Sequence, residues 1–192
     1  MDEEKIKQLQ NEFYSKNPKN FFFKKQQKID CATEISEKCD INTLLNNCVF
    51  IIPNTNSIFF DYTIFKVFAN PANYNNIINH INHLINYCIQ YFEKYSVHIN
   101  LSSFTITAYE RYKSLIMDFC NLCFQTQSNF SDRLTNMYIY NIPNMFDNIM
   151  ALAAPFVDRS VQSKIVTYNK KNTEELIKSY NHSFIEYITK LK

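Results

Sequence analysis

The residue types that could carry out chemistry in this chain are six cysteines, four histidines and scattered carboxylates. Cys120 and Cys123 have the C-x-x-C spacing found in zinc and redox sites. A zinc site needs four ligands, and no second C-x-x-C or suitably spaced histidine pair accompanies this one. Both residues fall within a helical apolar stripe, so we expect reduced thiols that pack in the core.

The histidines offer no clearer site. His80 and His83 lie one helical turn apart among asparagines, and metal binding would need a third ligand that the sequence does not supply. We therefore expect a solvent-exposed helix face there, while His98 stands alone in a predicted strand and indicates no role. No serine–histidine–acid set or carboxylate pair stands out by its spacing. The sequence thus predicts no enzyme, no resident metal and no cofactor.

The chain of 192 residues contains no glycine, whereas average usage predicts about 13. P-loop and Rossmann sites need glycine for close backbone approach to phosphate, and the G-x-S-x-G nucleophile elbow contains two glycines. These sites are therefore excluded in their usual form. Left-handed turn positions are expected to fall to asparagine, which is abundant. The excess of residues with AT-rich codons indicates an AT-rich genome, such as a compact viral or protist one.

Composition and charge narrow the class further. Apolar residues make up 46% and charged residues 20% of the chain, as in globular proteins, and the net charge of +2 does not indicate nucleic-acid binding. No apolar run is long enough to span a bilayer, and the charged start MDEEKIKQLQ does not resemble a targeting peptide. We expect a cytoplasmic protein with a short helical and basic extension over 1–45 and one domain over 46–192.

The elements that must position any site follow from periodicity. Strand-like runs predict a hairpin over 48–52 and 58–68, and further strands over 96–101, 136–142 and 163–168. Helical spacing predicts a short helix around Ile6, longer helices over 74–92 and 109–123, a short one over 144–154 and a last one starting at Asn172. Strands that alternate with helices predict an α/β fold with a mixed, mostly parallel sheet.

Two stretches are unusually apolar. The helix over 144–154 is polar only in its first turn, so the rest of it must be buried or face something other than water. The run 19–28 places Phe21, Phe22 and Phe23 beside Lys24 and Lys25. These rings could pack on the domain above a rim of lysines, or they could insert into a membrane surface while the lysines meet anionic lipids.

The segment 130–165 carries a family resemblance. It contains the turn Phe130-Ser131-Asp132-Arg133-Leu134, a strand ending Asn141-Ile142-Pro143, the apolar helix, Pro155-Phe156-Val157 and Ser163-Lys164-Ile165, in an order and spacing without a gap. This pattern resembles the CRAL-TRIO lipid-binding domain, the family of phosphatidylinositol/phosphatidylcholine transfer proteins and of tocopherol and retinaldehyde binders. The resemblance covers about 45–180 and suggests a minimal, glycine-free version of that domain.

The resemblance implies a mostly parallel sheet that floors a deep apolar pocket, with helices outside and a mobile gate helix at 144–156. The gate and pocket residues would then be Met145, Phe146, Ile149, Met150, Ala153 and Phe156. Lys164 and Asp132 stand where phosphoinositide-binding members hold the lipid headgroup, although Val161 replaces a threonine that assists there. Lys164 could equally be a surface lysine that opens a strand.

The implied function is binding, and transfer, of a phospholipid or other hydrophobic ligand without covalent chemistry. Transient membrane contact, peripheral association and no nucleic-acid partner go with this hypothesis. The alternative is a structural or protein-interaction module that keeps the fold without carrying lipid. Val161 and the short N-terminal region favour that alternative, in which a partner protein could complete the structure.

Overall fold

The computed structural model describes residues 3–18, 22–125 and 130–179. Its helices are α1 (Glu3–Lys16), α2 (Lys24–Lys38), α3 (Ile41–Cys48), α4 (Tyr62–Phe68), α5 (Tyr74–Phe92), α6 (Ile106–Gln125), α7 (Phe130–Arg133), α8 (Phe146–Ala153), α9 (Arg159–Gln162) and α10 (Lys170–Ser179). Two 3₁₀ turns are η1 (Pro71–Asn73) and η2 (Ala154–Phe156). The strands are β1 (Val49–Ile51), β2 (Ser57–Asp61), β3 (Tyr95–Asn100), β4 (Leu134–Ile142) and β5 (Ile165–Asn169).

The five strands form one sheet in the order β1-β2-β3-β4-β5. β1 pairs antiparallel with β2, and each of the other neighbouring pairs is parallel. The predicted mixed, mostly parallel α/β sheet is therefore confirmed. Parallel neighbours require a long crossover, and here helices provide it: α4 and α5 lie between β2 and β3, and α6 lies between β3 and β4.

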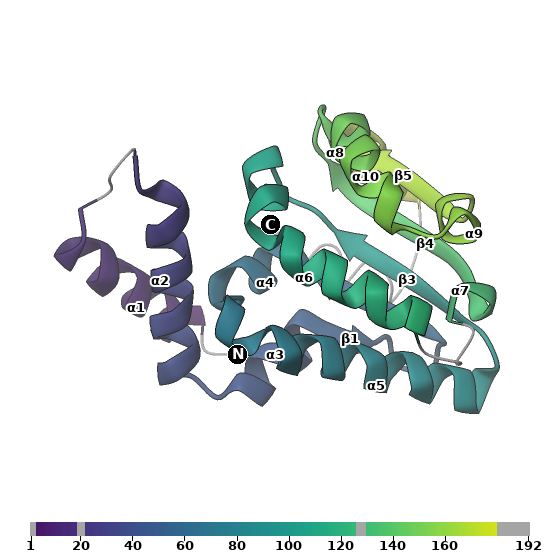
Figure 1. Ribbon diagram of the computed structural model, residues 1–192, viewed down its shortest axis with the longest axis horizontal. Helices are drawn as coiled ribbons and strands as arrows, with labels where there is room; N and C mark the ends of the chain where they lie inside the picture. Colours follow the sequence, from purple (N-terminus) through teal and green to yellow (C-terminus); the bar gives the residue numbers. More distant parts are fainter. Residues whose placement is uncertain (1–2, 19–21, 126–129, 180–192) are drawn as a thin grey trace.

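Alternate strand residues face opposite sides of the sheet, and both sides are covered by helices (Figure 1). Phe60, Ile99 and Ile139 face a layer that includes α5, α6 and α8. Phe59 and Tyr140 face the other way and pack in a separate cluster with α10. The two sides differ, because the first encloses cavities whereas the second is a small aromatic core.

The N-terminal helices pack against the same core as the rest of the chain. The predicted short helix around Ile6 is α1. Its residues Ile6, Leu9 and Phe13 are buried, and they belong to the cluster that also contains strand residues such as Ile139. Helices α2 and α3, which the sequence analysis did not predict, contribute further buried residues. Figure 1 shows α1 and α2 as a helical pair at one end of the molecule, next to α4.

Three predicted boundaries are wrong for local reasons. The strand predicted over 58–68 ends at Asp61, whose Oδ1 accepts a hydrogen bond from the Thr63 backbone N–H at 2.7 Å and thereby caps α4. The last helix begins at Lys170, because the Asn169 side chain caps it in place of Asn172. Helix α8 begins at Phe146, two residues later than predicted. The part of the last helix beyond 179 lies outside the described residues.

Four of the described residues have a left-handed backbone conformation, although the chain contains no glycine. Asn54 (φ 62°) and Asn141 (φ 55°) confirm that asparagine takes this role, but Glu93 (φ 64°) and Ser103 (φ 66°) adopt it too. A residue other than glycine or asparagine pays a steric penalty there, about 1–2 kcal/mol. The expectation that asparagine alone would serve is therefore wrong.

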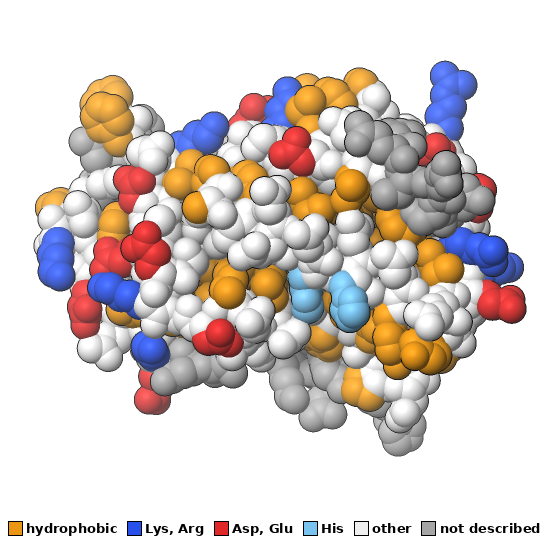
Figure 2. All heavy atoms as spheres, turned by 60° about the horizontal axis from the view of Figure 1, so that its bottom comes forward, with side chains coloured by type: hydrophobic (Ala, Val, Ile, Leu, Met, Phe, Trp, Pro, Cys, Tyr) orange, Lys and Arg blue, Asp and Glu red, His pale blue; other side chains and the backbone are white. Residues whose placement is uncertain are grey.

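The surface face in Figure 2 carries exposed hydrophobic side chains among mixed charges. Phe22 is 89% exposed and Phe23 65% exposed, while Phe21 lies outside the described residues. No helix in the described part of the chain combines the length and apolarity needed to cross a membrane.

Candidate functional site

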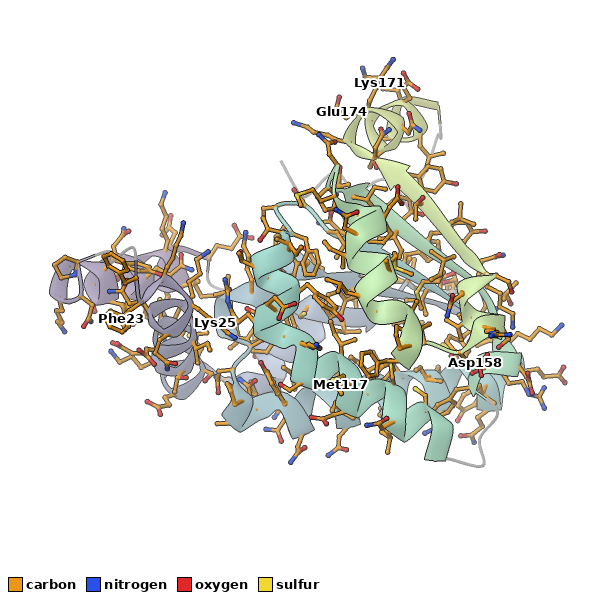
Figure 3. All side chains as sticks on the ribbon, turned by 45° about the horizontal axis from the view of Figure 1, so that its top comes forward. Phe23, Lys25, Met117, Asp158, Lys171 and Glu174 are labelled. Atoms are coloured by element: carbon orange, nitrogen blue, oxygen red, sulfur yellow. The ribbon has the colours of Figure 1, made fainter. Side chains whose placement is uncertain are left out.

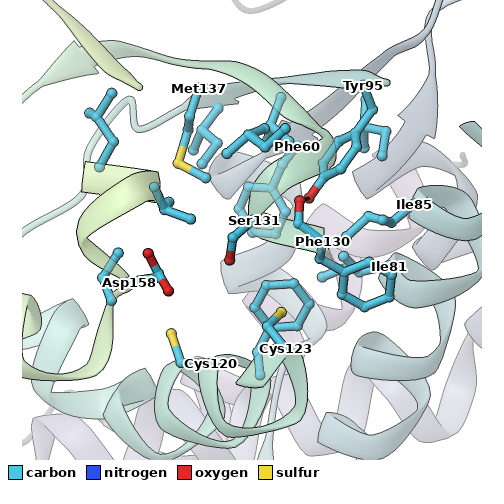
Figure 4. Close-up of a pocket in the computed structure, with 18 of the residues that line it drawn as sticks. Phe60, Ile81, Ile85, Tyr95, Cys120, Cys123, Phe130, Ser131, Met137 and Asp158 are labelled. Atoms are coloured by element: carbon cyan, nitrogen blue, oxygen red, sulfur yellow. Dashed lines mark hydrogen bonds between the residues drawn. The ribbon is translucent and has the colours of Figure 1, made fainter. Parts of the chain in front are cut away.

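An apolar cavity of about 300 Å³ lies between the sheet and the helices on its α5–α6–α8 side. Its floor is made by inward-facing strand residues, namely Val49, Ile58, Phe60, Val97, Ile99, Met137, Ile139 and Ile165. Its walls come from α5, α6, α7, η2 and α9 (Figure 4). The floor is apolar because alternate positions of the parallel strands are β-branched or aromatic.

A second cavity of about 280 Å³ adjoins the first. The two share six lining residues, Phe60, Ile81, Ile99, Phe119, Ile139 and Met150. Its far wall contains aromatic rings in edge contact, with Phe65 and Tyr112 4.7 Å apart between ring centroids and Tyr62 and Phe104 4.8 Å apart. The two cavities therefore form adjacent parts of one apolar interior.

Most of the predicted gate residues line this interior. Phe146, Ile149, Met150 and Ala153 of α8 line the second cavity, and Met150 also lines the first together with Phe156. Met145 lines neither cavity: it stands at the N-cap of α8 and is 50% exposed.

The outer side of α8 is also apolar in part. Leu152 is 45% exposed, and it was not among the predicted site residues. Helix α8 thus has one face on the cavities and another, partly apolar, toward solvent. The inner face agrees with the prediction of a non-aqueous partner, whereas the outer face is not buried in this structure.

The polar groups of the first cavity gather at one end. Ser131 and Asp158 line it, and in Figure 4 the oxygens of both side chains point toward the open space. Lys164 is half-buried, and its Nζ donates to the Ser131 carbonyl oxygen at 2.7 Å. Asp132 is exposed and does not line the cavity. Neither predicted headgroup residue therefore lines the cavity itself, but Lys164 is hydrogen-bonded to Ser131, which does.

Asp158 is a site residue that the sequence analysis missed. Its side chain caps α9, where Oδ1 accepts a hydrogen bond from the Ser160 N–H at 2.6 Å. The hydrogen bonds from Ser160 hold the pKa of Asp158 below its usual value, and the charge of Lys164 lowers it further. The carboxylate is thus ionised at neutral pH. An Asp-x-Ser pair that opens a helix could have signalled the cap, but not its place on a cavity.

The cysteines of the C-x-x-C motif lie on the cavity wall. Cys120 and Cys123 extend from α6 toward the cavity in Figure 4, and burial raises the pKa of Cys123 to about 12. A thiol with such a pKa is a poor nucleophile at neutral pH. Among the described residues, no group of three or more histidine, cysteine or acidic side chains could hold a metal ion.

The histidines differ from the prediction in part. His83 is exposed, but His80 is half-buried and its Nε2 lies 2.8 Å from the Val49 carbonyl oxygen. The prediction of a solvent-exposed position is therefore wrong for His80. His98 is buried on the α10 side of the sheet, where its Nδ1 lies 2.9 Å from the Tyr140 hydroxyl.

A mostly parallel sheet that floors an apolar interior, with an amphipathic helix over it, defines a class of ligand-enclosing α/β domains. The sequence model of the CRAL/TRIO domain matches residues 56–187, and the chain belongs to this family of lipid-binding and lipid-transfer proteins. No protein in the curated set matches the chain.

Among solved structures, 15 chains match. The crystal structure of Sfh5 is 14% identical in sequence and superposes with a TM-score of 0.55. The match covers 75% of this chain and 54% of the Sfh5 chain, so this chain spans about half the length of that neighbour. At this level of identity the likeness supports the fold.

Proposed function

We propose that the protein binds a lipid in the two adjoining cavities, with the lipid's polar end beside Ser131, Asp158 and Lys164. The observation that carries the proposal is the apolar lining of two adjoining cavities, of about 300 Å³ and 280 Å³. Transfer of an apolar chain from water into such a lining is favourable by roughly 25 cal/mol per Å² of apolar surface buried. A long acyl chain would therefore bind there without any covalent step.

The polar end favours a neutral or zwitterionic headgroup. One cation, Lys164, and one ionised carboxylate, Asp158, lie together there, and the lysine already donates to the Ser131 carbonyl. A headgroup with several negative charges would meet Asp158 at short range, which is unfavourable. We also propose that Lys164 contacts the ligand. Asp132 would contact a headgroup that extends beyond the cavity.

The unit formed by α8 and η2 is the proposed gate. Its inner side chains touch both cavities, so its displacement would open the interior, and exposed Leu152 and Met145 would meet bilayer hydrocarbon in the open state.

Phe22 and Phe23, flanked by the exposed Lys24 and Lys25, form a second candidate membrane contact. Replacing both rings by serine should weaken flotation with anionic vesicles and leave the bound lipid unchanged.

Mass spectrometry of the denatured protein tests the lipid directly, and two substitutions on α8 test the gate. Met150→Asp places a charge in the wall shared by the two cavities, and we expect it to abolish lipid retention. Leu152→Asp makes the same change on the exposed side, so retention should persist while transfer between vesicles falls.

A folded Met150→Asp variant that retains and transfers lipid normally would refute the gate and pocket assignment. Wild-type protein that is folded but contains no lipid, and takes none from vesicles, would instead favour an interaction module.

A further inference from the structure

A third cavity, of about 340 Å³, lies where the α1–α2 pair meets α4 and the start of α6. Three cationic side chains line it, one from each of three helices: Lys28 of α2, Lys66 of α4 and Arg111 of α6. None of the described residues that line it is a carboxylate. This end of the molecule is remote from the polar end of the lipid cavity: Figure 3 labels Lys25 of α2 at one side of the view and Asp158 at the other.

Lys66 and Arg111 are held in place by neutral partners. Lys66 Nζ donates to Ser103 Oγ at 2.6 Å and lies 5.8 Å from the Tyr62 ring centroid. The Arg111 guanidinium lies 5.3 Å from the Tyr112 ring centroid, and one of its nitrogens donates to the Tyr112 hydroxyl at 3.4 Å. Arg111 Nε is buried without a hydrogen-bond partner in the described structure.

These charges are therefore fixed but not neutralised. Within the described residues, neither Lys66 nor Arg111 forms a salt bridge. The acid whose charge acts on Lys66 is Asp61, whose Oδ1 already accepts hydrogen bonds from Thr63 and Asn100. Burial lowers the pKa of Lys66, the charge of Asp61 opposes this, and Arg111 lowers the pKa further. An anion between the two cations would remove their mutual repulsion.

The backbone adds to this positive field. Thr105 and Ala108 line the same cavity, and the Ala108 N–H donates to Thr105 Oγ1 at 3.2 Å in the first turn of the 20-residue helix α6. The N-terminal end of a long helix carries a partial positive charge that favours anions. Three cations and one helix end thus surround a space with hydroxyl donors but no described acid.

We propose that this cavity is a binding site for a phosphate monoester, held by Lys66 and Arg111 with Lys28 as a third cation. A monoester carries about −1.5 to −2 charges at neutral pH and three acceptor oxygens, which matches a site of three cations better than a carboxylate would. A guanidinium and an ammonium supplied by two different helices are suited to a tetrahedral anion. The phosphate could belong to a small soluble ester or to the headgroup of a lipid.

Calorimetric titration with glycerol phosphate and flotation with phosphatidylcholine vesicles that contain phosphatidic acid test the two sources. These probes present the same phosphate monoester, free in one case and in a bilayer in the other. We expect Lys66→Gln and Arg111→Gln each to weaken binding at least tenfold. Lys113→Gln, which removes one charge from α6 at a position that does not line the cavity, should change it less than twofold.

The two probes distinguish a soluble phosphate ester from a lipid headgroup. Binding of the soluble ester that depends on Lys66 assigns a soluble ligand, and Lys66-dependent binding to vesicles alone assigns a lipid headgroup. If circular dichroism shows that Arg111→Gln does not fold, Lys66→Gln alone still tests the site. The Lys66 side chain is half-exposed, so we expect its replacement to leave the fold intact. No binding of either probe, or equal loss in Lys113→Gln and Lys66→Gln, would overturn the site. The result of this test does not depend on whether the protein binds lipid in the other two cavities.

Discussion

Replacement of His98 by glutamine should remove a large part of the acid sensitivity of this fold. His98 is 7% exposed, its ring stacks on Tyr138 at 4.9 Å between centroids, and its Nδ1 lies 2.9 Å from the Tyr140 hydroxyl. Burial lowers the pKa of His98 to about 4 from an ordinary value of 6.5. Glutamine keeps a polar group for Tyr140 but does not titrate in this range.

The sign and the size of the effect follow from that shift. The neutral imidazole is the folded form, so the unfolded chain binds a proton below about pH 6.5 while the folded chain does so only near pH 4. Stability is therefore complete above the unfolded pKa and is lost as the pH falls toward the folded one. A difference of roughly 2.5 units at 1.36 kcal/mol each gives a loss on the order of 3 kcal/mol.

Urea denaturation of both proteins at several pH values between about 7.5 and 4 measures this loss. Carboxylates titrate in both proteins, so the difference in unfolding free energy isolates His98. We expect the wild type to lose about 3 kcal/mol more than His98→Gln over this range, even if the variant is less stable at neutral pH. Parallel stability curves for the two proteins would refute the buried, neutral state of the imidazole.

Three further predictions concern the fold. Glu93→Gly should raise the unfolding free energy by about 1 kcal/mol, because Glu93 ends α5 with a left-handed backbone that glycine adopts without a penalty; thermal denaturation checks this. Cys48 is fully buried with a raised thiol pKa, so a thiol reagent should label half-buried Cys39 and leave Cys48 unreacted until the protein unfolds. Asn100→Ala should cost roughly 2–4 kcal/mol in urea denaturation, since buried Asn100 donates to Asp61; an unchanged midpoint would contradict it.

The long periodic elements of the fold could be predicted from the sequence. Helix α5 was predicted with its observed bounds, Tyr74–Phe92, because its apolar residues recur over five turns. The predictions were wrong where a single side chain decides the structure. Tyr62–Phe68 is rich in aromatic and β-branched residues and resembles a strand, yet the Asp61 cap makes it a helix. Such a cap satisfies N–H groups that a strand would leave to a neighbour.

The candidate site was predictable only in part. The lining role of Phe146, Ile149 and Met150 follows from an apolar helix that needs a non-aqueous partner, and the resemblance supplied that partner. Asp158 and Ser131 could not be found in this way, because their place at the cavity end depends on the packing of α7 against α9, far from any local pattern. The cationic cavity was even less predictable, because Lys28, Lys66 and Arg111 are widely separated in sequence. The packing of α2 on α4 brings the first two together, and the start of α6 adds the third.

The proposed gate also requires a fixed point from which to move, and the strand end before it supplies one. The Asn141 side chain donates to Asn100 Oδ1 at 2.9 Å, and the Asn141 N–H donates to Thr173 Oγ1 at 3.0 Å, so β4 is tied to β3 on one side and to α10 on the other. Helix α8, by contrast, begins at Phe146, and its N-cap residue Met145 makes no side-chain capping hydrogen bond. Weakly held helix ends open more easily than strands within a sheet. The turn between Asn141 and Met145 is therefore where the gate would hinge, and the pocket floor would stay in place while it opens.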